Sequence, residues 1–173
     1  MDLAIIGFAD TTLPPHIMLS RLLVAAVLGG ALGFEREDHA PAGFRTHILI
    51  ATAACLFTLL TFEIFHLSDV VQSGRSDPIR SIKAVTAGIA FLGAGAIFQS
   101  RGSVQGLTTA AGMWLAGAVG IAAALGFYVV AIAVSALAVV VLALLRSLTH
   151  HGQSSAPPDR PTNDPGAAAT RED

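Results

Sequence analysis

The stretch Ala84–Ile121, AVTAGIAFLGAGAIFQSRGSVQGLTTAAGMWLAGAVGI, decides the fold. It joins two apolar segments through a short polar turn, Gln99–Gly106, and nearly every third or fourth apolar position is glycine or alanine. A glycine inside a helix costs about 1 kcal/mol relative to alanine, so a water-soluble core is not built this way. In a bilayer, small residues let helix backbones approach closely and associate. The stretch therefore predicts two tightly packed transmembrane helices.

The composition of the whole chain agrees with a membrane protein. Of its 173 residues, 53% are hydrophobic and only 13% are charged, whereas soluble domains carry about 25% charged residues. The 10 basic and 12 acidic side chains give a net charge of −2, which does not favour a nucleic-acid partner. Cys55 is the only cysteine, so an intrachain disulfide and a thiolate metal site are excluded. We expect no metal site and no cofactor.

Five apolar segments are predicted to cross the membrane. Each has about 18–20 residues, close to the length that a hydrocarbon core of about 30 Å requires. The last two segments meet at Gly126 almost without a loop, which predicts a tight antiparallel hairpin or one strongly kinked helix. The predicted spans are residues 17–34, 46–65, 81–98, 107–125 and 127–145.

The two ends of the chain differ from the spans. Residues 1–16 form a short acidic lead without Lys or Arg, unlike the positively charged start of a signal peptide. Residues 147–173 are rich in Pro, Ala, Ser and Asp and lack apolar periodicity, so we expect a disordered tail. With five spans and the N-terminus outside, six basic residues lie on the cytoplasmic side and four on the outer side. The positive-inside rule therefore favours an outer N-terminus and a cytoplasmic C-terminus.

Three clusters of polar and glycine residues mark the ends of the spans. In this order and spacing they resemble the MgtC/SapB family of bacterial inner-membrane proteins, and the resemblance covers about residues 19–145. The clusters are GFERE at 33–37 with PAGFRTH at 41–47, DPIR at 77–80 with GIAFLGAG at 88–95, and GLTTAA at 106–111.

The resemblance implies a five-span inner-membrane protein linked to growth at low magnesium, to acid stress and, in pathogens, to survival inside host cells. No enzymatic activity is established for the family. Ala90 stands where a glycine is common in the family, and Gln105 stands where a basic residue is frequent. Several members carry a soluble domain after the last span. Only a short tail follows here, so we expect the function of that domain to be absent or supplied by another protein.

The polar clusters supply the candidate functional residues. The charged residues that end span one and precede span two form either an ion-pair network that faces a partner or an interfacial anchor on lipid phosphates. Asp77 is predicted to cap the third helix and to pair with Arg80. The two threonines either pack helices or line an ion path. The candidates are Glu35, Arg36, Glu37, Arg45, Asp77, Arg80, Thr108 and Thr109.

Eight glycines are predicted to bring helices together. They are Gly29, Gly33, Gly88, Gly93, Gly95, Gly106, Gly112 and Gly120. The stripe that contains Gly112 and Gly120 suits either a seam within the chain or a dimer interface.

Other ionisable residues near the span ends allow further interpretations. Arg21 and Lys83 are expected to extend to the membrane interface. Glu63, Asp69 and Asp77 on the outer side would attract Mg²⁺, but acids spread over about fifteen residues do not have a ligand spacing. The span centres carry no ionisable group, which argues against an ion-coupled pump.

These observations predict an all-α polytopic transmembrane bundle of the bacterial inner membrane. No sequence motif for catalysis is present, so we expect a non-enzymatic protein. We expect it to regulate another membrane system in adaptation to low Mg²⁺ or acid stress, embedded in the lipid bilayer and acting through a membrane-protein partner or a homo-oligomer. The alternatives are a Mg²⁺ channel or transporter, in which the glycine-rich spans form a passage, and a structural interaction protein.

Overall fold

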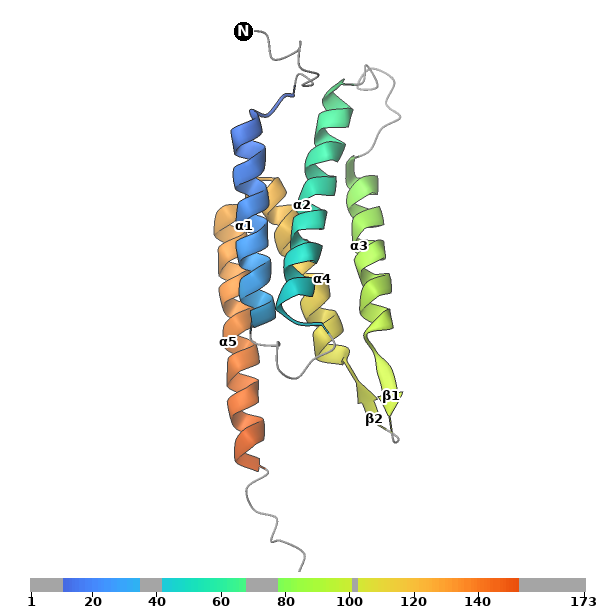
Figure 1. The fold of residues 1–173 in the computed structure, drawn as a ribbon, viewed down its shortest axis with the longest axis vertical. Coiled ribbons are helices and arrows are strands. Elements are labelled where there is room, and N and C mark those ends of the chain that lie inside the picture. The colour runs from blue at the N-terminus through green and yellow to red at the C-terminus, as the bar shows by residue number, and fades with distance from the viewer. Residues whose placement is uncertain (1–10, 35–41, 68–77, 101–102, 153–173) are drawn as a thin grey trace, which may run out of the picture.

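The computed structural model of the chain describes residues 11–34, 42–67, 78–100 and 103–152. In this part of the chain five helices lie side by side and alternate in direction (Figure 1). The all-α fold class is confirmed. The helices are α1 (Pro15–Phe34), α2 (Phe44–Leu67), α3 (Pro78–Gly95), α4 (Leu107–Ala124) and α5 (Tyr128–Gly152), and a hairpin of β1 (Phe98–Ser100) and β2 (Ser103–Gln105) joins α3 to α4.

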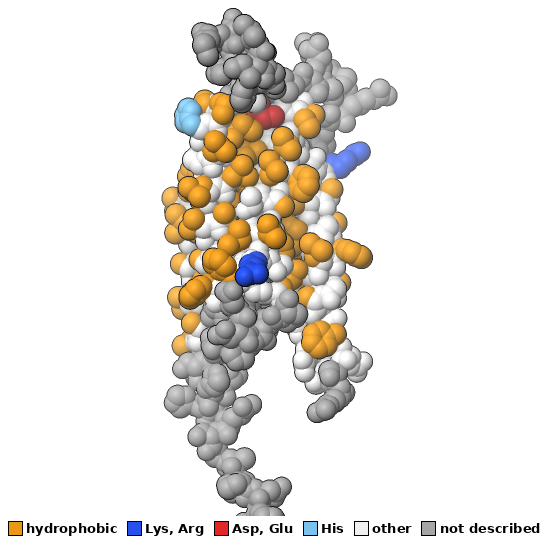
Figure 2. Space-filling view, in the orientation of Figure 1, with side chains coloured by type: hydrophobic (Ala, Val, Ile, Leu, Met, Phe, Trp, Pro, Cys, Tyr) orange, Lys and Arg blue, Asp and Glu red, His pale blue; other side chains and the backbone are white. Residues whose placement is uncertain are grey.

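The surface of the bundle is that of a membrane protein. Among the described residues, three helices are long and apolar enough to cross a membrane, namely α1, α2 and α4. Hydrophobic side chains cover the helices in Figure 2, and Leu23, Phe91 and Val129 are 67%, 80% and 82% exposed. Exposed apolar surface of this extent is unfavourable in water and normal in lipid. The chain is therefore embedded in a bilayer.

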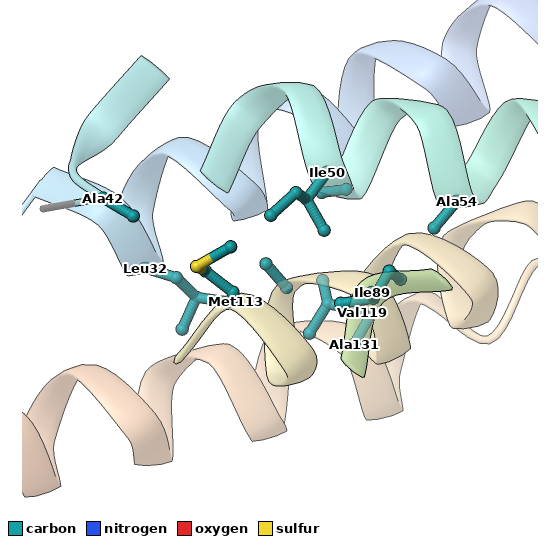
Figure 3. Packing of buried hydrophobic residues seen from close by; sticks show 10 residues of the cluster. Leu32, Ala42, Ile50, Ala54, Ile89, Met113, Val119 and Ala131 are labelled. Atoms are coloured by element: carbon teal, nitrogen blue, oxygen red, sulfur yellow. The ribbon is translucent and has the colours of Figure 1, made fainter. Parts of the chain in front are cut away.

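The centre of the bundle lies where α2 passes between α1 and α4. Ala51 on α2 is fully buried there. A Cβ on Gly29 of α1 would lie 2.6 Å from the Ala51 Cβ, and a Cβ on Gly120 of α4 would overlap the Ala51 carbonyl oxygen. Glycine thus brings both neighbouring backbones into contact with α2. Apolar side chains surround this contact, among them Leu32, Ile50, Met113 and Val119 (Figure 3).

Helix α4 contacts each of the other four helices, whereas α3 lies at the edge of the bundle (Figure 1). A Cβ on Gly93 would make an ordinary contact of 3.4 Å with the Ala110 Cβ. At Gly88 and Gly95, a Cβ would meet no atom of the described chain within 4 Å. The expectation that these two glycines bring helices together is therefore wrong within the single described chain. Gly88 instead lines an apolar groove between α2 and α3.

The connection from α3 to α4 differs from the prediction. Helix α3 spans Pro78–Gly95, whereas the predicted span is residues 81–98. The start at Pro78 is the one expected if Asp77 caps the helix, because proline, which lacks an N–H, fits the first position of a helix. The predicted turn is an antiparallel hairpin in which Gln99 pairs with Val104, so its backbone groups bond to each other. Gly106, with φ 86°, then turns the chain into α4.

The connection from α4 to α5 is the predicted antiparallel hairpin. Gly126 has φ 82°, its N–H donates to the Ala123 carbonyl oxygen (3.1 Å), and the Phe127 N–H donates to the Ala122 carbonyl oxygen (2.9 Å). This is the Schellman pattern that ends a helix at a glycine.

Helix α5 continues to Gly152, so residues 147–152 are helical and not part of a disordered tail. The chain offers no glycine or proline between residues 127 and 151 that would end the helix earlier. Residues 153–173 and residues 1–10 of the acidic lead lie outside the described residues.

Candidate functional site

Two polar sites lie at opposite ends of α2. We call the end of the bundle where α1 begins the upper end and the other the lower end, as in Figure 1. The upper site is built on Glu63, which lies near the end of α2 and is only 4% exposed. Its carboxylate accepts hydrogen bonds from the Thr12 N–H (2.8 Å), the Thr12 hydroxyl (2.6 Å) and the Leu13 N–H (3.1 Å). These bonds tie the segment before α1 to α2.

Arg21 on α1 belongs to the same site. Its Nη1 donates to the carbonyl oxygen of Ala124, the last residue of α4. The last carbonyls of a helix lack partners within the helix and carry partial negative charge, so a guanidinium stabilises them. The Arg21 side chain thus points to Ala124, where the apolar helix α4 ends, and we keep its extension to the membrane interface as a prediction.

A cavity of about 270 Å³ lies between these groups. Thr12, Arg21, Glu63 and His66 line it, so a carboxylate, a guanidinium and an imidazole share one small space. The Glu63 carboxylate already accepts three hydrogen bonds there. It is therefore not an exposed carboxylate at the outer side that would attract Mg²⁺, as the sequence suggested. Among the described residues, no group of three or more His, Cys, Asp or Glu side chains is placed to hold a metal ion.

The lower site is built on His47, near the start of α2. The imidazole is fully buried, and its Nδ1 lies 2.9 Å from the Gly43 carbonyl oxygen. A Cβ on Gly33 of α1 would lie 2.9 Å from the His47 Cβ, and a Cβ on Gly112 of α4 would lie 3.0 Å from Nε2. The two glycines therefore make the space that His47 fills. Sequence reasoning did not single out His47, although an ionisable residue within a span is itself a signal.

The predicted polar candidates are spread over both ends. Arg45 and Thr108 are exposed at the lower end, where α2 and α4 begin, and Thr109 is buried at 3% exposure. Arg80 is exposed near the start of α3 at the upper end, so the structure does not bring it to Arg45. The other candidates, Glu35, Arg36, Glu37 and Asp77, lie outside the described residues.

Comparisons with known proteins agree with this architecture. A family model described as "MgtC family" matches residues 22–151. A protein named MgtC from Brucella abortus is 42% identical over 125 residues, which cover 72% of this chain and 49% of the relative. A putative magnesium transporter, YhiD, from Escherichia coli is 36% identical over 132 residues (75% of this chain, 60% of the relative). Protein SapB from Bacillus subtilis is 34% identical over 116 residues (66% and 50%).

The match covers only part of these relatives. The aligned part of the chain spans 49% to 60% of their length. No solved structure matches the chain.

Proposed function

The chain belongs to the MgtC family, and on that basis we propose that it regulates another membrane system during adaptation to low Mg²⁺ or acid stress. In this proposal the protein is non-enzymatic and lies in the bacterial inner membrane. The names of the relatives support a link to magnesium, because one is called a putative magnesium transporter. The proposed orientation places the upper end outside and the lower end in the cytoplasm, in agreement with the distribution of basic residues.

The close packing of Gly29 and Gly120 against Ala51 is the observation that favours regulation over transport. Mg²⁺ gives up its water reluctantly and usually keeps several water molecules, so a passage for it must be wide and polar. Between α1, α2 and α4 the structure has backbone contacts at Gly29 and Gly120 and apolar side chains around them. Such an interior favours a protein that acts through its surface.

The lower end offers the surface for such action. Arg45 and Thr108 are exposed there, at the starts of two helices that form the centre of the bundle. We propose that they contact a membrane-protein partner or a second copy of the chain, and that the charged residues Glu35–Glu37, which follow α1 in the sequence, extend the same surface. In the proposed orientation this surface faces the cytoplasm.

Growth at limiting Mg²⁺ tests the regulatory role. In a bacterium that lacks its own family member, the wild-type chain is expected to restore growth. Arg45→Ala and Thr108→Ala are each expected to need about ten times more expressed protein than the wild type to restore growth. A loss of about 1.4 kcal/mol at the interface would weaken binding to the partner by that factor. Both side chains are exposed, so the amount of protein in the membrane should not change.

Ser20→Ala is the matched control for this experiment. Ser20 is exposed on α1 near the upper end, and its hydroxyl donates to its own helix at the Ile17 carbonyl oxygen (2.8 Å). It is expected to rescue growth like the wild type. If both lower-end variants also rescue growth at wild-type expression, the proposed contact surface is wrong.

Transport of Mg²⁺ is the second candidate function. The name of the Escherichia coli relative favours it. It requires a passage that the closed contact at Ala51 does not offer between α1, α2 and α4, so it needs a different arrangement of the helices or a passage between copies of the chain. A direct measurement of ion flux distinguishes the two functions.

A further inference from the structure

The segment before α1 is fastened to the bundle by one buried carboxylate. Glu63 Oε2 accepts the Thr12 N–H, and Oε1 accepts both the Thr12 hydroxyl and the Leu13 N–H. The donors lie on two consecutive residues that are 51 and 50 positions away in the sequence. The Thr11 hydroxyl also donates to the Leu13 carbonyl oxygen (2.7 Å), which shapes the segment itself. Thus three of the hydrogen bonds that hold this segment end on Glu63.

The fastened segment forms one wall of the cavity at the upper end. Thr12 and Leu13 line the cavity of about 270 Å³, opposite Arg21 and the end of α4. The Nε atom of Arg21 is buried and has no hydrogen-bond partner in the described part of the chain. Movement of the segment would therefore widen a cavity that contains a charged group with an unused donor.

The bonds depend on the charge of Glu63. An ionised carboxylate only accepts hydrogen bonds, and it accepts them about twice as strongly as a neutral group. Protonation removes that charge and turns one oxygen into a donor, while the two backbone N–H groups that face the carboxyl group can only donate. The three bonds of the present geometry therefore cannot all keep their strength after protonation.

We propose that residues 11–14 are a strap that ionised Glu63 holds against the Arg21 cavity, and that loss of the carboxylate charge releases it. In the part of the chain that the structure describes, the titratable groups around this site are His66 and the buried Cys55 on α2, and Arg21 and the exposed His16 on α1. The strap is formed by contacts within a single chain. This inference therefore does not depend on whether the protein regulates a partner or conducts an ion. It makes the upper end responsive to acid.

Amide hydrogen exchange of Thr12 and Leu13 reads the strap directly, because both amides donate to Glu63. We would measure it by NMR on the full chain in lipid nanodiscs, as protection factors relative to unstructured peptide. At neutral pH both amides are expected to be protected in the wild type, and Glu63→Gln is expected to lower both protection factors about tenfold or more. The amides of α4 report whether the bundle is still folded.

Thr61→Val is the matched control on the same helix. The Thr61 hydroxyl bonds to its own helix at the Phe57 carbonyl oxygen (2.8 Å), so the strap should keep its wild-type protection. Acidification of the wild type supplies a second measurement that requires no variant. The protection factors of Thr12 and Leu13 should fall while those of α4 persist, and in Glu63→Gln they should be low at every pH. Equal strap protection in wild type and Glu63→Gln, or loss of α4 protection together with the strap under both conditions, would overturn the proposal.

Discussion

A Gly120→Ala variant is expected to lose about 3 kcal/mol of unfolding free energy, the magnitude of a severe overpacking substitution. The added methyl group would overlap the carbonyl oxygen of Ala51 on α2. That oxygen belongs to the backbone, which cannot move aside as a flexible side chain can. Helices α2 and α4 would have to separate, and the contact between α2 and α1 at Gly29 is part of the same packing. Equilibrium unfolding in mixed detergent micelles measures the loss.

Gly88→Ala is the matched control for this substitution. Gly88 also lies within a helix, but a Cβ there would meet nothing within 4 Å in the described chain. Because alanine favours the helix more than glycine, the variant is expected to be as stable as the wild type or up to about 1 kcal/mol more stable. Equal stability of the Gly120 and Gly88 variants would contradict the close contact between α2 and α4.

Gly106→Ala is expected to have the second large effect, a loss of about 2–4 kcal/mol from backbone strain and steric overlap together. Gly106 has φ 86°, a conformation that costs other residues about 1–2 kcal/mol. A Cβ there would also overlap the Ala96 carbonyl oxygen, at the end of α3. The residue thus fixes how the chain passes from the β-hairpin into α4. The same unfolding experiment measures the loss.

Gly126→Ala separates the two causes. Gly126 has nearly the same φ, 82°, but the nearest atom to an added Cβ is Arg21 Nη2 at 3.3 Å, the end of a flexible side chain. The backbone strain is then the main cost, beside a shift of a few tenths of an ångström by the Arg21 guanidinium, so the expected loss is about 1–2 kcal/mol. If Gly126→Ala costs as much as Gly106→Ala, the close approach between Gly106 and Ala96 does not contribute to stability.

The helices themselves could be predicted from the sequence, because the length of an apolar segment determines whether it can span a bilayer. The starts of α1 and α4 lie within two residues of the prediction. The hairpin at Phe98–Gln105 could not be predicted, since its two strands have three residues each and a polar composition typical of a turn. Helix α5 extends beyond the predicted end at residue 145, because the next helix-breaking residue, Gly152, ends the helix and the change in composition at residue 147 does not.

The two polar sites required the structure. The upper site joins Thr12, Arg21, Glu63 and the end of α4, and the contact between Arg21 and Ala124 spans 103 positions. No local pattern in the sequence carries such a contact. Glycine spacing was informative but incomplete: it marked Gly29 and Gly120, which form the centre, and also Gly88 and Gly95, which have no packing partner in the described chain. Spacing shows which backbones can approach and not which ones do.

Mg²⁺ uptake into sealed liposomes that contain the purified full chain is the most direct test of the proposal that the protein regulates and does not transport. The assay would compare protein-free liposomes, the wild type, and a double variant with Asp77→Ala and Arg80→Ala, of which Arg80 lies at the outer end in the proposed orientation. We predict that neither protein raises the initial rate of uptake above that of protein-free liposomes. Saturable uptake by the wild type that disappears in the folded double variant would contradict the regulatory role and identify a channel or carrier.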